Sequence, residues 1–156
     1  MFEQRRRGAK RRRGAALVEA ALVLPLVLLF FMGIVEYGRW LMTLHLFNNA
    51  ACYGAAYASK HTSPIVISGV TYGNAVSDVQ NAVTSVLAGQ QLVGQAINVF
   101  QSDSAGNNLG AFTNAQPGQY VCVQITGTYY FTITSMLQLP VSYAETFQCV
   151  RLSEGN

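Results

Sequence analysis

The sequence predicts an α+β fold: a long N-terminal transmembrane helix that extends into a small domain with a second helix and an antiparallel sheet of three or more strands. An uncharged apolar run directly follows a strongly basic head. Apolar residues then recur at helical spacing, and the C-terminal part alternates between apolar and polar residues as strands do. The expected organisation is a basic leader at 1–14, a membrane helix at 15–38 and an exported domain at 39–156.

The charge of the chain is unevenly distributed. Seven of the ten basic residues lie within the first thirteen positions, where Glu3 is the only acid. The head therefore carries +6 and the rest of the chain −3, which together give the formal net charge of +3. Short basic flanks of a spanning helix stay on the cytoplasmic side. We expect a single-pass protein of the cytoplasmic (inner) membrane, with its N-terminus in the cytoplasm and its C-terminal domain periplasmic or extracellular.

The apolar run is long enough to cross a membrane. From Ala15 to Val35 it has 21 residues, interrupted only by Glu19. A helix that spans a hydrocarbon core of about 30 Å needs roughly 20 such residues. The run then passes into Glu36-Tyr37-Gly38-Arg39-Trp40, where Tyr37 and Trp40 are placed as interfacial anchors. No small-residue cleavage site ends the run, which argues against an ordinary secretory signal peptide.

Two features of this N-terminal region have alternative interpretations. The basic head could bind nucleic acid, but a topology signal explains it without a nucleic-acid partner. Glu19 is costly inside an apolar helix, and such a carboxylate marks a function with a partner charge. Alternatively, Glu19 lies near the cytoplasmic headgroups and is in contact with water.

The helical pattern continues beyond the membrane segment. A stripe of apolar and small residues recurs at spacings of three and four, as on one face of a helix: Trp40, Leu44, Phe47, Ala51, Gly54 and Ala58. We expect one helix from Ala15 to Ser59, so that helix 39–60 is continuous with the membrane helix. Pro25 is expected to kink or loosen its inner half, and Pro64 to end it.

The rest of the exported domain predicts one more helix and several strands. Asn74–Ala88 has one apolar face and is followed by Gly89, a plausible helix stop. Short and long strands are expected at 96–101, 120–133 and 141–152, with a turn around 137–140 between the last two. On the middle strand, one face is expected to carry Val121, Val123, Ile125, Tyr129, Phe131 and Ile133.

The three cysteines are Cys52, Cys122 and Cys149, and none forms a Cys-x-x-Cys pair that would indicate a zinc or redox site. All lie in the part expected outside, where disulfides persist. If the last two strands pair around Ser135-Met136, Cys122 and Cys149 lie opposite each other, and a disulfide between them is our hypothesis. The alternative is two small buried apolar residues. Cys52 would be the odd cysteine, buried or available to a partner.

Residues for catalysis, cofactors or metals are not apparent. His45 and His61 have no Cys, Asp or Glu at ligand spacing, and we expect them to be solvated or structural. Residues 103–108 lack the alternating oxygen ligands of a calcium loop and predict a turn. There is no phosphate-binding glycine-rich loop and no nucleophile elbow. We therefore expect no enzyme, although a membrane-tethered enzyme with an unrecognised site is one alternative.

The N-terminal region resembles a known family. The stretch from Arg13 to Leu26, which contains Gly14, Glu19 and Pro25, resembles the N-terminus of TadE-like proteins. These are pilin-like components of the Tad (Flp) tight-adherence pilus system of bacteria. The resemblance continues through Gly33–Arg39 and at Asn49-Ala50-Ala51 with Gly54-Ala55. It covers about 45 contiguous residues, and the combination of these motifs is more specific than any one of them.

The resemblance implies a class III signal sequence in a minor pilin or pseudopilin. A prepilin-type peptidase would cut between Gly14 and Ala15, so that Glu19 becomes the fifth residue of the mature chain. The Glu19 carboxylate would then meet the α-amine of a neighbouring subunit, and pairing would offset the cost of burying either charge. The implied partners are the membrane, that peptidase, other pilin-like subunits and the pilus assembly platform, and the implied outer domain is pilin-like.

The leading alternative is an uncleaved anchor. In that case the protein is a single-pass envelope protein whose extracytoplasmic domain binds a partner or the cell wall. The basic head would then persist in the mature protein, because no peptidase removes it.

Overall fold

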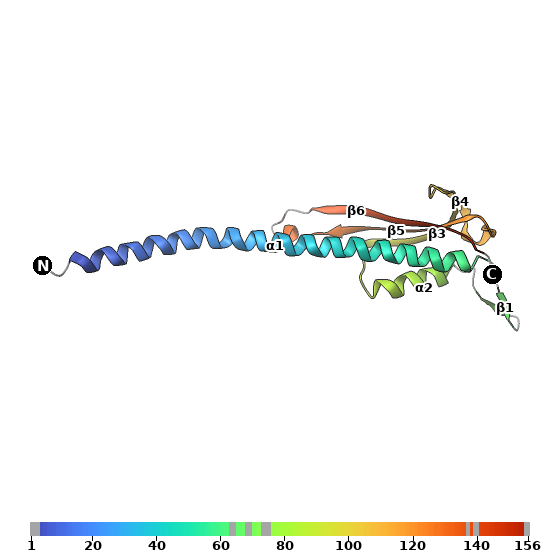
Figure 1. The fold of residues 1–156 in the computed structure, drawn as a ribbon, viewed down its shortest axis with the longest axis horizontal. Helices are drawn as coiled ribbons and strands as arrows, with labels where there is room; N and C mark the ends of the chain where they lie inside the picture. Colours follow the sequence, from blue (N-terminus) through green and yellow to red (C-terminus); the bar gives the residue numbers. More distant parts are fainter. Residues whose placement is uncertain are drawn as a thin grey trace. The chain divides into compact units, whose positions relative to one another are not determined.

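The computed structural model describes residues 4–62, 65–67, 70–72, 76–136, 138 and 141–154. The chain has two compact units, Met1–Arg39 and Trp40–Asn156. As predicted, the fold is α+β, with a long N-terminal helix, a second helix and an antiparallel sheet (Figure 1).

Helix α1 runs from Gln4 to Lys60, so the predicted helix from Ala15 to Ser59 is confirmed, and helix also forms N-terminal to it. Pro25 lies inside α1, which continues on both sides of it. The helix ends at Lys60, where the His61 N–H bonds the Ala58 carbonyl at 3.1 Å. Pro64, which we expected to end the helix, lies outside the described residues.

The second unit contains the sheet and the shorter helices. Its four-stranded antiparallel sheet has the order β4-β3-β5-β6, and a separate hairpin pairs β1 with β2. In chain order after α1, the elements are β1 (Ile65–Ile67), β2 (Val70–Tyr72), α2 (Val76–Leu87), β3 (Val93–Ser102), β4 (Asn108–Ala111), the 3-10 helix η1 (Phe112–Asn114), β5 (Tyr120–Tyr130), α3 (Thr132–Met136) and β6 (Ser142–Leu152).

Most of the predicted elements of this unit are confirmed. The predicted helix at 74–88 is α2, which ends before Ala88 and Gly89, both with positive φ (49° and 86°) as at many helix C-termini. The strands predicted at 96–101, 120–133 and 141–152 are β3, β5 and β6. Most of the predicted turn at 137–140 lies outside the described residues. The hairpin β1–β2 and the strand β4 were not predicted.

The predicted end of the middle strand is wrong. β5 stops at Tyr130 and the chain forms α3, so Ile133 does not continue the strand face. Two local hydrogen bonds favour the helical turn: Thr134 Oγ1 donates to the Phe131 carbonyl (3.1 Å), and Ser135 Oγ donates to the Thr132 carbonyl (2.6 Å). Hydroxyl side chains that bond nearby carbonyls in this way compete with strand pairing.

The hydrophobic core lies between one face of the sheet and two helices. Figure 1 shows α2 and the last part of α1 beside the sheet, and both helices contribute to this core. The sheet contributes residues of β3, β5 and β6. Gly54 of α1 lies against Val83 of α2 and Val123 of β5. The buried core residues are Phe47, Ala50, Ala51, Ala55, Ala58, Val79, Val83, Leu87, Leu92, Val99, Phe112, Ala115, Val121, Val123, Ile125 and Phe147.

The last part of α1 and strand β6 contact each other along the second unit and run in the same direction. Near the start of both, the Trp40 ring lies 6.4 Å from the Tyr143 ring, and its Nε1–H donates to Glu145 Oε1 at 3.3 Å. Further along, Phe47 and Phe147 pack with ring centroids 5.5 Å apart. Beyond the end of β6, the Glu154 N–H bonds the Ser59 carbonyl at 2.9 Å. The contacting residues of α1, at the start of the unit, and of the β6 region, at its end, therefore follow the same order.

Candidate membrane and assembly site

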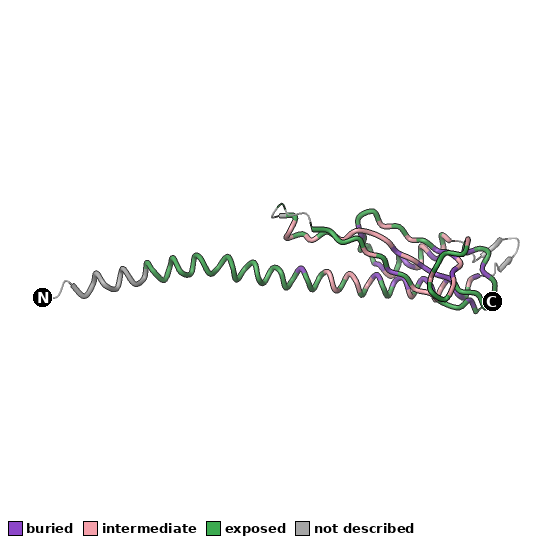
Figure 2. Tube along the Cα trace, turned by 90° about the horizontal axis from the view of Figure 1, so that it is seen from above, coloured by how far each residue is buried: buried purple, intermediate pink, exposed green. Residues whose placement is uncertain are grey.

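The N-terminal part of α1 has an apolar surface that the chain itself does not cover. The helix from Gly14 onward contains a stretch long and apolar enough to cross a membrane, and none of that stretch is buried within the molecule. Figure 2 shows this part as exposed along its described length. Leu17, Val18 and Leu22, for example, are each about 70% exposed. A single apolar N-terminal helix of this kind indicates a single-pass membrane protein.

The three residues expected at a processing and registration site lie on this exposed helix. Gly14, Ala15 and Glu19 are all exposed. Ala15 and Glu19 are four residues apart, which places their side chains on the same face of the helix. Leu22 and Val23 continue that face, so the Glu19 carboxylate lies in an apolar surface. A carboxylate in this setting needs a cationic partner when the surface is covered by lipid or protein.

The exit sequence, Glu36–Trp40, follows the apolar run and contains a second acidic residue, to which the sequence alone assigned no role. Glu36 is only 6% exposed, although it lies on the same helix as the exposed Glu19. Its Oε2 lies 3.8 Å from Arg39 Nη1, one turn further along. The spacing of three residues between an acid and an arginine was the sequence signal that could have indicated this pair.

Trp40, expected as an interfacial anchor, begins an aromatic cluster in the second unit. Its ring lies 6.3 Å from Phe131 and 6.4 Å from Tyr143, and Phe131 also packs edge-on against Tyr129. The hydrogen bond from Trp40 Nε1 to Glu145 satisfies the indole N–H. These contacts hold Trp40, the first residue of the second unit, against strand β6 and the end of β5.

The predicted opposition of Cys122 and Cys149 is wrong. In the register of β5 and β6, Cys149 is the partner of Val123, and Cys122 is the partner of Val150. Partners on antiparallel strands point to the same face, and neighbours along a strand point to opposite faces. Cys149 therefore lies on the core face with Val123, whereas Cys122 is fully buried on the other face with Val150.

The thiol that does lie beside Cys149 is that of Cys52 in α1. Burial and a hydrogen bond with the Cys52 side chain raise the pKa of Cys149 to about 11. Both side chains are partly exposed, and all three cysteines are free thiols in this structure. Burial also raises the pKa of Cys122.

Asp103 and His61, two of the residues considered for metal binding, have structural partners, whereas His45 is exposed. The Asp103 carboxylate accepts hydrogen bonds from the backbone N–H groups of Ala105 and Asn107, both at 2.9 Å, and from Asn107 Nδ2 at 2.7 Å. Residues 103–107 thus form the predicted turn. The His61 ring stacks on Tyr57, with centroids 4.1 Å apart. Among the described residues, no group of three or more His, Cys, Asp or Glu could hold a metal ion.

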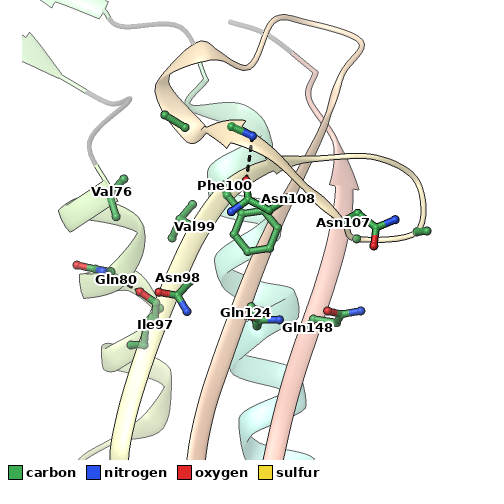
Figure 3. A pocket seen from close by; sticks show the side chains of 14 residues that line it. Val76, Gln80, Ile97, Asn98, Val99, Phe100, Asn107, Asn108, Gln124 and Gln148 are labelled. Atoms are coloured by element: carbon green, nitrogen blue, oxygen red, sulfur yellow. Dashed lines mark hydrogen bonds between the residues drawn. The ribbon is translucent and has the colours of Figure 1, made fainter.

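The outer face of the sheet carries an open, neutral hollow of about 820 Å³ beside the β3–β4 turn. Figure 3 shows the amide side chains of Asn98, Gln124 and Gln148 and the ring of Phe100 along it. Gln80 of α2 closes one side by donating to the Ile97 carbonyl at 2.8 Å. The lining contains no charged side chain, so the hollow offers hydrogen bonds but no acid–base group.

Comparison with known proteins identifies a family that part of this chain resembles. A family model described as TadE-like protein matches residues 14–56. No curated protein and no solved structure matches the chain. The matched segment begins at Gly14, contains Glu19 and the exit sequence, and ends in the part of α1 that packs in the core. Residues 14–56 of this chain are therefore similar to TadE-like proteins.

Proposed function

We propose that this protein is a minor pilin or pseudopilin that takes part in the assembly of a Tad-type pilus. The TadE-like match associates the chain with that system. The observation that carries the proposal is the exposed apolar surface of α1, in which Glu19 is the only charged residue between Gly14 and Val35. A helix of this kind is held in the membrane and then packs against the helices of other subunits. Its function is binding and assembly, and no enzymatic step is assigned to it.

The role of Glu19 follows from its surroundings. After cleavage between Gly14 and Ala15, the new α-ammonium group would lie within about one helical turn of the Glu19 carboxylate. When subunits pack, the carboxylate of one chain pairs with the amine of the next. A buried charge that loses its partner costs about 3–5 kcal/mol, whereas the intact pair offsets much of that cost. The pair therefore fixes the register between subunits.

The basic head and the second unit have separate roles in this proposal. Before cleavage the head holds the N-terminus in the cytoplasm, and the second unit reaches the outer side of the cytoplasmic membrane. A prepilin-type peptidase then removes residues 1–14. The second unit presents the surface for other pilin-like subunits and for the assembly platform.

Processing is tested by the N-terminal sequence and intact mass of the protein recovered from membranes. We expect a chain that starts at Ala15. Gly14→Leu should retain the basic head, because it replaces the glycine at the proposed cut with a bulky residue. A wild-type chain that retains the head would overturn the proposal and favour the uncleaved anchor.

Assembly is tested in the same strain with Glu19→Ala and the conservative Glu19→Asp as its matched control. Glu19→Ala should insert into the membrane and be processed, but piliation should fall sharply because the neighbouring amine is left unpaired. Glu19→Asp retains the charge and should support more pili than Glu19→Ala. Normal piliation with Glu19→Ala would contradict the registration role.

A further inference from the structure

We infer that the second unit is cross-linked by a disulfide between Cys52 of α1 and Cys149 of β6. The inference rests on the proposed export of this unit, because disulfides persist outside the cytoplasm and are rare within it. The cross-link would join the helix that carries the membrane segment to the last strand of the sheet. It differs from the Cys122–Cys149 pairing that the sequence suggested.

The strand register selects Cys149 over Cys122 as the partner of α1. Cys149 pairs with Val123, and Val123 in turn pairs with Val99, so all three side chains lie on the core face that the helices cover. Cys122 lies between Phe100 and Val150 on the opposite face. The sheet itself therefore separates Cys122 from the Cys52 thiol.

Contacts on either side of the pair hold α1 and β6 together. Phe47 and Phe147 pack on the N-terminal side of the two cysteines, with ring centroids 5.5 Å apart. On the C-terminal side, the Glu154 N–H bonds the Ser59 carbonyl at 2.9 Å. Cys52 and Cys149 lie between these contacts along α1 and β6 and are close enough that Cys52 contributes to the raised pKa of Cys149. The disulfide forms when the two sulfur atoms approach to the bond length of about 2.0 Å.

The reaction needs an oxidant of the thiol–disulfide class. A thiolate from one cysteine attacks the disulfide of an exported oxidoreductase, or of oxidised glutathione in vitro, and releases one of its sulfurs as a thiolate. The second cysteine then displaces the other sulfur. Two S–H bonds are lost and one S–S bond forms in the protein, while the oxidant gains two electrons and two protons and leaves as thiols.

The surroundings of the pair indicate a structural rather than a redox-active disulfide. Redox-active cysteines have lowered pKa values, because the thiolate is the attacking and leaving species. Burial and the contact with Cys52 instead raise the pKa of Cys149 to about 11. Cys149 is therefore a poor leaving group, and once formed the bond should be reduced slowly.

The test is peptide mapping of the full-length protein recovered from membranes after free thiols are blocked with N-ethylmaleimide. The sequence suits this experiment, because no Lys or Arg lies between Lys60 and Arg151. Trypsin releases Trp40–Lys60 with Cys52, and a second cut after Glu145 separates Cys149 from Cys122. We expect Trp40–Lys60 joined to residues 146–151, and Cys122 as an unlinked peptide.

Variants provide the matched control. Cys52→Ser and Cys149→Ser should each abolish the linked peptide, whereas Cys122→Ala should retain it. Reductant should lower the melting temperature of the wild type and of Cys122→Ala, but not that of Cys52→Ser. Wild-type protein in which Cys52 and Cys149 are both blocked, or in which Cys149 is linked to Cys122, would overturn the inference, whether or not a variant folds.

The intact mass of the same sample separates this inference from the proposed function. A chain that starts at Ala15 but has free Cys52 and Cys149 refutes only the disulfide. A chain that carries the disulfide but retains the basic head refutes only the pilin processing.

Discussion

Gly54 shows how closely single residues determine the packing of the second unit. It lies where α1 meets both α2 and β5, and a Cβ atom added there would clash with the side chain of Val83. The added atom would also lie 3.3 Å from Val123 Cγ1, tighter than ordinary van der Waals contact. Val83 and Val123 are both fully buried and β-branched, so neither can rotate easily out of the way. The small side chain is therefore required by the close approach of the three elements.

We predict that Gly54→Ala destabilises the full-length protein, although alanine is the better helix former. Overpacking costs about 1–3 kcal/mol, and the gain in helix propensity offsets about 1 kcal/mol of it. Urea unfolding in detergent, followed by circular dichroism, measures the net loss. Gly38→Ala is the matched control, since a Cβ at Gly38 meets no atom within 4 Å. Val83→Ala should reduce the penalty of Gly54→Ala, and a penalty unchanged in that background would refute the clash.

The β3–β4 turn shows how one residue organises an element. Asp103 is partly exposed, and its carboxylate accepts three hydrogen bonds from N–H groups of Ala105 and Asn107. The side-chain hydrogen bond from Asn107 is the largest cause that lowers the pKa of Asp103 below its ordinary value of 3.8. Because the folded pKa is depressed, the ionised carboxylate stabilises the turn above the unfolded pKa. That stabilisation is lost as the pH falls through the folded pKa.

We predict that protonation of Asp103 loosens this turn, and that Asp103→Ala loosens it at every pH. Hydrogen exchange of the Ala105 and Asn107 amides, measured by NMR, reports the change. Exchange in the wild type, corrected for intrinsic rates, should accelerate only below the ordinary pKa of 3.8. Asp78→Ala, on a different element, is the control and should leave these two amides unchanged. Equal protection in Asp103→Ala and wild type would count against the role of the carboxylate.

The elements differ in how far their sequence determines them. The helices α1 and α2 and the strands β3, β5 and β6 were predictable because several residues in each repeat the period of one buried face. Strand β4 and the hairpin β1–β2 are only three or four residues long, too short to show a period. The register between β5 and β6 was the other feature that was predicted wrongly. The point about which β5 and β6 pair is displaced by half a residue from the expected one, so Cys149 lies on the face opposite Cys122. The alternation of apolar and polar residues within each strand is the same in both registers, so it could not distinguish them.

At the scale of the whole molecule, the buried core and the exposed apolar surface belong to different parts of the chain. Every buried core residue lies at Phe47 or later. The long run of exposed apolar side chains lies between Leu17 and Tyr37. The apolar run predicts the helix that carries Glu19, whereas the roles of Gly14 and Glu19 in processing and assembly stay a prediction from the family resemblance. The sequence could not predict what covers that helix, because in the proposed function the covering atoms belong to lipid or to other chains.

We predict that a fragment beginning at Trp40 folds without detergent, because it contains the entire buried core and the aromatic cluster around Trp40. It should unfold cooperatively, with a free energy on the order of 5–15 kcal/mol. The full-length protein is the control and should require detergent, since it retains the exposed apolar helix. A fragment that shows no cooperative transition would mean that residues before Trp40 contribute to the core.

The pairing of α1 with β6 also determines when the second unit can fold. The ribosome makes the α1 residues Phe47 and Ser59 early, but their partners Phe147 and Glu154 are made at the end of the chain. Contacts between residues so far apart in sequence form slowly and only after the intervening chain is present. In the proposed export of this unit, the apolar face of α1 therefore stays uncovered by β6 until β6 has crossed the membrane. Under that proposal the emerging chain is accessible to proteases and prone to aggregation throughout that interval, so its yield should depend on the rate of translocation.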